Sequence, residues 1–347
     1  MEGNIERHPR PAGPEQSWER SLRKAKEYMY KRLGPGLNFA VRSGAGEWSR
    51  VSYGEIDEDR GETGPDVLYD IASMTKLVTA LQILELVTQN QLSLEDRAGE
   101  YLEFLTESPL RIQDLLAHRG SQVLTREKYR PGTVYLRSDL KRIFENGANL
   151  SVERPGDYNY GDLGYLHLGM ILERVTGPSL DEQTTEFTAR YELGDLMYNP
   201  IAKGVEMDLV ARSERANLPG QVQDEKAQWY AGVSGHAGLF ASQRALETLS
   251  ERLLREEFAL SPAIYERLYT PEFDPSPHTG MSFSIAGIRR GLYSTLSNVS
   301  GFGGSSLFLE PTQRKALVHT CNITYPERGR TRAEFRRWNK SVGTLLL

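Results

Sequence analysis

Strand-like segments gather at the two ends of this 347-residue chain, and helix-like segments fill the part between them. Near the N-terminus, residues 37–42 and 48–53 are rich in β-forming side chains and flank a short glycine-containing loop, which indicates a hairpin. Near the C-terminus, strand character returns at residues 283–288, 305–309 and 317–323. This arrangement predicts an α/β (α+β) fold in which strands from both ends form one sheet.

The middle of the chain, residues 92–268, has a mainly helical texture. Apolar side chains recur at helical spacing most clearly at residues 112–118, 164–175 and 243–258. We also expect helices at residues 18–32, which are charged and amphipathic, and within residues 330–347.

These segments predict one domain made of two lobes. The sheet lobe would comprise about residues 18–91 and 280–347, and the helical lobe about residues 92–279. Residues 1–17 are polar and contain three prolines, so we expect a flexible leader there. A cleft between two such lobes is a natural place for a functional site.

The composition excludes several classes of function. Hydrophobic residues make up 39% and charged residues 26% of the chain, and the formal net charge of −5 gives no support to nucleic-acid binding. The single cysteine, Cys321, excludes an intrachain disulfide and a multi-cysteine zinc site, and the six histidines lack metal-binding spacing. We see no signal-peptide core and no apolar run of membrane-spanning length, so we expect a cytoplasmic protein without a membrane span.

A Ser-x-x-Lys tetrad, Ser73-Met74-Thr75-Lys76, opens an apolar helical segment directly after a strand-like run at residues 67–71. Residues three apart on a helix lie on the same face, so Ser73 and Lys76 are expected to meet. A serine hydroxyl becomes a good nucleophile when a neighbouring base takes its proton, and a lysine can be that base if its pKa falls toward neutrality. Taken alone the tetrad is weak evidence, because many helices contain it by chance.

Two further motifs follow the tetrad in order along the chain. Tyr160-Gly161-Asp162 leads from a Pro-Gly loop into a helical segment, and Val299-Ser300-Gly301 opens a glycine-rich stretch. Together the three motifs resemble those of the serine hydrolases of the class C β-lactamase and penicillin-binding-protein type, which include esterases and D-amino-acid peptidases. That family carries Ser-x-x-Lys, then Tyr-x-Asn, then a Lys/His-Thr/Ser-Gly strand.

The resemblance extends beyond the motifs, over about residues 37–330. The flanking segments that are similar to this family lie at residues 94–102, 111–118 and 235–242. The resemblance implies a β-lactamase/transpeptidase-like fold, with an antiparallel sheet flanked by helices, a mostly helical lobe and the site between them. It implies no cofactor and no metal ion.

The family resemblance also implies a role for each motif residue. Ser73 would be the acylated nucleophile and Lys76 its base or proton relay. Tyr160 would shuttle a proton between Ser73, Lys76 and the leaving group. The oxyanion hole would consist of two backbone N–H groups, those of Ser73 and Phe302.

Asp162 departs from the family pattern, which usually has asparagine at this position. An ionised Asp162 near Lys76 would favour the ammonium form of the lysine, because opposite charges stabilise each other. The role of base would then shift toward Tyr160. Alternatively, Asp162 could simply cap the helix that follows it, since aspartate is favoured at helix N-caps.

Val299 is the second departure, because it occupies the place of the family's lysine or histidine. A cation there would help to anchor a substrate carboxylate, and valine cannot. With Ser300 and Gly301, Val299 is expected to line the substrate-binding strand, where glycines let a substrate backbone approach closely. An ordinary glycine-rich strand is the alternative interpretation.

The sequence therefore predicts a serine hydrolase that acts through a Ser73 acyl-enzyme on a small ester, amide or D-peptide, with an esterase as the main expectation. The alternatives are a β-lactamase or D-amino-acid peptidase and, from another class, a degenerate member that binds a ligand without catalysis. His236 is a candidate base, but a structural role is the expectation for it and for His118 and His167. The oligomeric state is left open.

Overall fold

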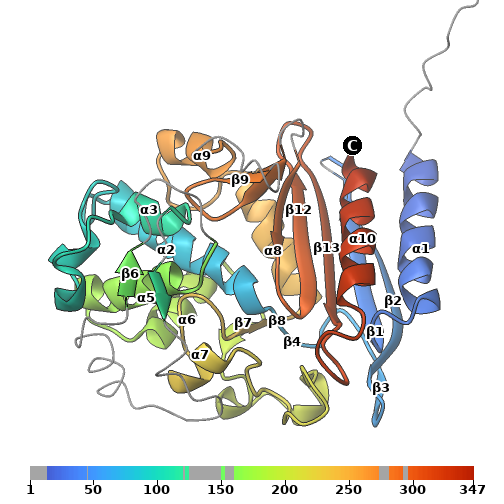
Figure 1. Ribbon diagram of the computed structural model, residues 1–347. Coiled ribbons are helices and arrows are strands. Elements are labelled where there is room, and N and C mark those ends of the chain that lie inside the picture. The colour runs from blue at the N-terminus through green and yellow to red at the C-terminus, as the bar shows by residue number, and fades with distance from the viewer. Residues whose placement is uncertain are drawn as a thin grey trace, which may run out of the picture.

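A central antiparallel sheet joins the two ends of the chain (Figure 1). The computed structural model describes residues 14–44, 46–119, 122–124, 150–152, 160–272, 281–291 and 296–347; most of the expected leader lies outside these ranges. The sheet has eight strands in the order β3-β2-β1-β13-β12-β11-β10-β9. Their bounds are β1 Gly36–Arg42, β2 Trp48–Asp57, β3 Arg60–Glu62, β9 Met281–Phe283, β10 Arg289–Gly291, β11 Ser297–Ser300, β12 Gly304–Glu310 and β13 Lys315–Asn322.

Strands β1 and β13 pair at the centre of this sheet, so the first strand of the chain is completed by the last. Their side chains alternate between the two faces, as the pleat requires. On β13, Leu317 points into the cluster that contains Phe39 and Trp338, whereas Val318 packs with the helical lobe. The sheet therefore has apolar packing on both faces.

Helices cover these two faces. Helices α1 (Pro14–Tyr30) and α10 (Arg332–Gly343) lie side by side on the outer face, where Trp338 Nε1 donates to the Lys24 carbonyl at 2.9 Å (Figure 1). Helix α8 (Gln243–Leu254) packs against β1, β12 and β13 on the inner face.

The second lobe is mainly helical and contains α2, which is buried along nearly its whole length (Figure 1). Its helices are α2 Thr75–Thr88, α3 Ile112–Leu116, α5 Leu163–Thr176, α6 Leu180–Arg190, α7 Glu225–Trp229 and α9 Pro262–Leu268. Short 3₁₀ turns lie at Ala72–Met74, Ala98–Glu100, Glu103–Leu105, Ile201–Lys203, Met207–Leu209 and, after α10, Thr344–Leu346. A small sheet has the order β4-β8-β7, formed by Tyr69–Asp70, Leu239–Ala241 and Leu196–Tyr198, and β5 (Gln122–Leu124) pairs with β6 (Leu150–Val152).

The predicted fold class, an α/β (α+β) chain with one antiparallel sheet from both ends, is confirmed. Two predicted strands are wrong in detail. The strand expected at residues 67–71 shrinks to β4, which pairs with β8 outside the main sheet. The strand expected at residues 283–288 is instead a turn between β9 and β10, because Gly287 has a φ of +63° and its N–H bonds back to the Ser284 carbonyl.

Within the described ranges, no helix combines the length and the apolar character needed to cross a bilayer.

Candidate active site

Ser73 lies in the 3₁₀ turn that connects β4 to α2. Ala72, just before it, has a φ of +46°, a left-handed conformation that is uncommon for a residue with a side chain and clusters at functional sites. The Asp70 carboxylate holds this turn, since its Oδ1 accepts the Ala72 N–H at 2.8 Å. Lys76 Nζ, on the first turn of α2, donates to Ser73 Oγ at 3.0 Å. The structure thus brings the two ends of the tetrad together.

The Lys76 ammonium group is buried, with 4% of its side chain exposed, and it faces three acceptors. Besides Ser73, it donates to Asp162 Oδ1 at 3.0 Å and to the backbone carbonyl of His236 at 3.2 Å. The ring centroid of Tyr160 lies 5.3 Å from Nζ. The geometry therefore surrounds the lysine with groups that stabilise its charged form.

Electrostatics follow from this geometry. Burial by itself would lower the pKa of Lys76, but the charges of Tyr160 and Asp162 outweigh burial and hold the pKa of the lysine above its usual range. Burial would raise the pKa of Asp162, and the positive charges around it, Lys76 first, hold that pKa well below its usual range. The two residues are an ion pair at neutral pH, so Lys76 is not available there as a neutral base.

Asp162 stands at the N-cap position of α5, yet its side chain makes no capping hydrogen bond. Its two oxygens face two lysines instead: Oδ1 faces Lys76 and Oδ2 lies 2.9 Å from Lys226 Nζ. The sequence-based alternative, a simple helix cap, does not describe what this carboxylate does.

The third motif ends a strand that lies against the nucleophile turn. A side-chain carbon at Gly301 would come within 2.3 Å of the Ile71 carbonyl oxygen, and one at Gly303 within 3.3 Å of the Asp70 carbonyl. Only glycine permits the first of these approaches. Phe302 lies between the two glycines, and its ring is covered by the Arg332 guanidinium at 4.0 Å. The backbone at Phe302 is thereby held beside the segment that leads into Ser73.

A small pocket connects the motifs. Its lining residues are Ser73, Lys76, Leu77, His118, Tyr160, Ala286, Gly287, Asn298, Val299 and Ser300. Five predicted site residues therefore share this pocket, whereas Asp162, Gly301 and Phe302 support its walls. Among these lining residues, Lys76 is the one lysine or arginine, and Val299 contributes an apolar surface.

His118 is a pocket residue for which the sequence predicted a structural role. It has a φ of +58°, and its ring centroid lies 4.5 Å from that of Tyr160 and 5.1 Å from that of Tyr165. The residue belongs to the segment 111–118, whose resemblance to the family was visible, but no local pattern indicated that its ring would meet Tyr160.

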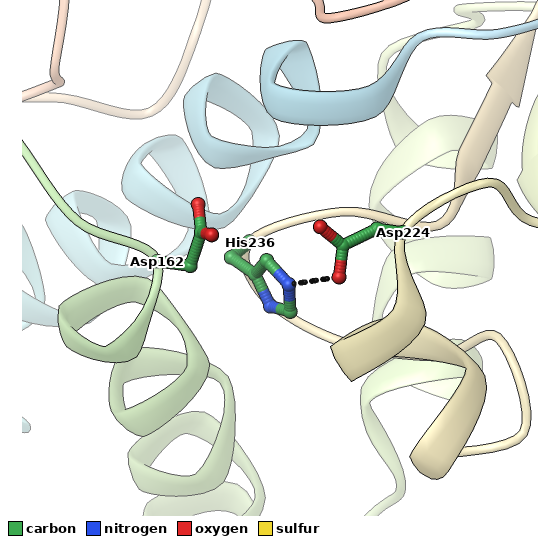
Figure 2. Close-up of side chains that lie close together, drawn as sticks. All are labelled: Asp162, Asp224 and His236. Carbon is green, nitrogen blue, oxygen red and sulfur yellow. Dashed lines mark hydrogen bonds and ion pairs between the residues drawn. The ribbon is translucent and has the colours of Figure 1, made fainter. Parts of the chain in front are cut away.

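A second polar cluster, formed by Asp224, Lys226 and His236, lies behind Asp162; of these residues only His236 was considered from the sequence, with a structural role as the expectation. Figure 2 shows Asp162, Asp224 and His236 pointing toward one another from the start of α5, the start of α7 and the loop before β8. His236 Nε2 lies 2.8 Å from Asp224 Oδ1, and Lys226 Nζ lies 3.8 Å from Asp224 Oδ2. The His236 ring is thus held by its contact with Asp224, while its backbone carbonyl accepts a hydrogen bond from Lys76 Nζ.

Comparison with known proteins bears directly on this geometry. The family model described as Beta-lactamase matches residues 23–339. The chain belongs to the β-lactamase family. Family members and relatives of this kind are serine hydrolases, and the chain is an enzyme of that class.

Among the relatives of this β-lactamase family member, a putative D-alanyl-D-alanine carboxypeptidase of Escherichia coli K12 is 28% identical over 299 residues, which is 74% of this chain and 69% of that protein. The β-lactamase/D-alanine carboxypeptidase of Yersinia pestis has the same fold, with a TM-score of 0.77 at 15% identity over 97% of this chain and 100% of that one. EstCE1, a hydrolase with promiscuous acyltransferase activity, gives 0.75 at 17% identity over 96% and 98% of the two chains. The resemblance and the fold stated from the sequence are confirmed.

Proposed function

We propose that the protein is an esterase-like serine hydrolase that forms an acyl-enzyme on Ser73. One observation carries this proposal: Ser73 Oγ, Lys76 Nζ and Tyr160 line the same pocket, with the serine and lysine in hydrogen-bond contact at 3.0 Å. A nucleophile, a fixed positive charge and a phenol in one open pocket are the groups that acyl transfer through a serine requires.

The charged state of Lys76 assigns the proton steps. Tyr160 takes the Ser73 proton as Oγ attacks the carbonyl carbon, and the Lys76 ammonium stabilises the negative charge on the phenol oxygen. The N–H groups of Ser73 and Phe302 stabilise the oxyanion, each contributing on the order of 3 kcal/mol. Tyr160 then gives its proton to the leaving alcohol. In the second half-reaction it takes a proton from the attacking water and passes it to Ser73 Oγ as the acyl group leaves.

Val299 guides the choice of substrate. It is 8% exposed and packs with the apolar core, yet it lines the pocket where a cation would otherwise meet a substrate carboxylate. Neutral esters and amides without that carboxylate therefore fit this pocket better than β-lactams or peptide C-termini. The name of the E. coli relative favours a D,D-carboxypeptidase as second candidate, and the pocket wall at Val299 argues against it.

The test combines turnover and covalent labelling. Ser73→Ala should abolish hydrolysis of p-nitrophenyl acetate and butyrate as well as labelling by a fluorophosphonate, because it removes the nucleophile. Ser43→Ala, which removes a hydroxyl in an exposed turn, is the matched control and should behave like wild type.

Mass spectrometry of the labelled peptide should place the adduct on Ser73. A wild-type protein that neither turns over esters nor labels would contradict the proposed function and favour a non-catalytic binder. Faster acylation by nitrocefin or by a D-alanyl-D-alanine peptide than by the esters would instead overturn the substrate assignment.

A further inference from the structure

Asp162 is shared by two ammonium groups that come from different helices. Its Oδ1 lies 3.0 Å from Lys76 Nζ on α2, and its Oδ2 lies 2.9 Å from Lys226 Nζ on α7. Only Lys76 reaches the pocket; Lys226 is not among the pocket's lining residues. Lys226 therefore contacts the reacting groups through the carboxylate alone.

We propose that Lys226, balanced by Asp224, is a positioning residue that sets how tightly the Lys76–Tyr160 pair holds its proton during acylation of Ser73. This inference rests on the proposed function. Facing Asp162 alone, Lys76 would meet a full negative charge at hydrogen-bond distance, and the pair would hold its proton more tightly than it does with Lys226 in place. Lys226 neutralises part of that charge from the far side of the carboxylate.

Asp224 acts in the opposite direction. It caps α7, since its Oδ1 accepts the Ala227 N–H at 2.9 Å, and its Oδ2 lies 3.8 Å from Lys226 Nζ. Burial would raise the pKa of Asp224, but the charges of His236 and Lys226 hold it well below its usual range. A permanent negative charge therefore stands behind Lys226 and weakens its effect on Asp162.

His236 connects this network to Lys76. Its ring Nε2 lies 2.8 Å from Asp224 Oδ1 (Figure 2). On the other side of the ring, Nδ1 lies 2.7 Å from Ser234 Oγ. With the ring held on both sides, its backbone carbonyl keeps its position 3.2 Å from Lys76 Nζ. This network thus places charges near Lys76 and also holds the carbonyl that accepts a hydrogen bond from it.

The three side chains of Figure 2 could by spacing also hold a metal ion, because one ligand atom from each lies within 4.8 Å of the others. The Lys226 ammonium already contacts both carboxylates. The positive charge that a metal ion would bring is thus supplied by the chain itself.

Other titratable groups face this network and stay unchanged in the variants below. They are Asp70 behind Asp224, His118 and Tyr165 around Tyr160, and the Glu225–Arg328 pair on the outer side of α7.

The test is the pH dependence of the second-order rate of Ser73 labelling by a fluorophosphonate, measured from about pH 5 up to the highest pH at which the protein stays folded. The acid limb of this profile reports the base of the free enzyme. Lys226→Met removes a positive charge and should move that limb to higher pH by about one unit. Asp224→Asn removes a negative charge, keeps the cap, and should move it to lower pH. The double variant should return toward wild type, and Lys226→Arg should stay close to it.

Lys24→Met, which removes a lysine paired with Glu27 on the outer helix α1, is the control for net charge and should leave the limb in place. The inference is wrong if the acid limb stays at the wild-type pH in both single variants, or if it moves in the same direction in both, while Ser73 is still labelled. If Lys226→Met does not fold, Asp224→Asn and Lys226→Arg carry the test. A wild-type Ser73 that does not label contradicts the proposed function instead, so the two failures are distinguishable.

Discussion

Tyr160, the residue that we propose transfers protons, is exposed at the pocket. It is 42% exposed at the pocket, packs against His118 on one side and lies near the Lys76 ammonium on the other. A residue this exposed contributes little to the hydrophobic core, so its substitution reports on chemistry more than on folding.

Tyr160→Phe should therefore lower kcat for p-nitrophenyl esters by about 10²–10⁴-fold, the range for loss of a general acid–base group, with little change in KM. Steady-state kinetics and the thermal unfolding midpoint test this together. A variant that keeps at least about a tenth of wild-type kcat would assign the proton transfer to another group.

Individual residues also show which parts of the candidate site the sequence could predict. Ser73, Lys76, Tyr160 and Val299 could be proposed from the sequence because their motifs are short and ordered along the chain, and the structure brings them to one pocket. Lys226 could not be found in this way, because its relation to Asp162 exists only after α7 packs beside α5. The burial of charge at Asp162 likewise depends on a contact between distant segments.

At the scale of elements, the junction between β11 and the nucleophile turn forms the wall of the pocket. The end of β11 comes so near the Ile71 carbonyl that no side chain fits at Gly301. Behind this strand, Ser300 and Ser306 are linked at 2.9 Å, and Asn339 of α10 donates to Ser306 at 3.1 Å. The position of the strand is thus fixed from both sides.

Gly301→Ala should push β11 away from the turn, because its added carbon would lie 2.3 Å from a backbone oxygen. We expect a loss of about 1–3 kcal/mol in unfolding free energy and a larger proportional loss of esterase activity. Gly61→Ala is the matched control, since nothing lies within 4 Å of a carbon added there. Equal behaviour of the two variants in urea unfolding and ester turnover would contradict this description of the wall.

Element prediction failed where a glycine changed the backbone. The segment at residues 283–288 has the composition of a strand, but the positive φ of Gly287 converts it into a turn that lines the pocket. Conversely, β1, β12 and β13 were predicted nearly to their ends, because each holds a cluster of apolar, β-forming side chains, and nearly all of their residues are buried.

At the scale of the whole molecule, buried titratable groups in both lobes couple stability to pH. Burial lowers the pKa of His167 on α5 to about 3 and that of His319 on β13 to about 4. Unfolded histidines bind protons near pH 6.5, so between these values the unfolded chain holds more protons and stability falls as pH falls. The Asp70 carboxyl has the opposite effect on stability. Burial raises its pKa to about 6, so the folded chain holds this proton more tightly than the unfolded chain, and stability falls as pH rises toward 6.

His167→Leu should remove the contribution of one buried histidine to the pH dependence of stability. Between about pH 6.5 and pH 4, its unfolding free energy should fall less steeply than that of wild type, by about 1.4 kcal/mol per pH unit. Urea unfolding at several pH values gives the two slopes. Parallel slopes would show that His167 does not titrate on unfolding in this window.

The pairing of β1 with β13 has a consequence for synthesis on the ribosome. Residues 37–42 and 316–321 form one ladder, although some 280 residues separate them. A nascent chain that already carries Ser73, Lys76 and Tyr160 still lacks the strand that completes β1, the pocket wall at Val299 and the N–H of Phe302. On the proposed function, Ser73 therefore emerges well before the groups that would make it reactive, and hydrolysis would begin only when translation is nearly finished.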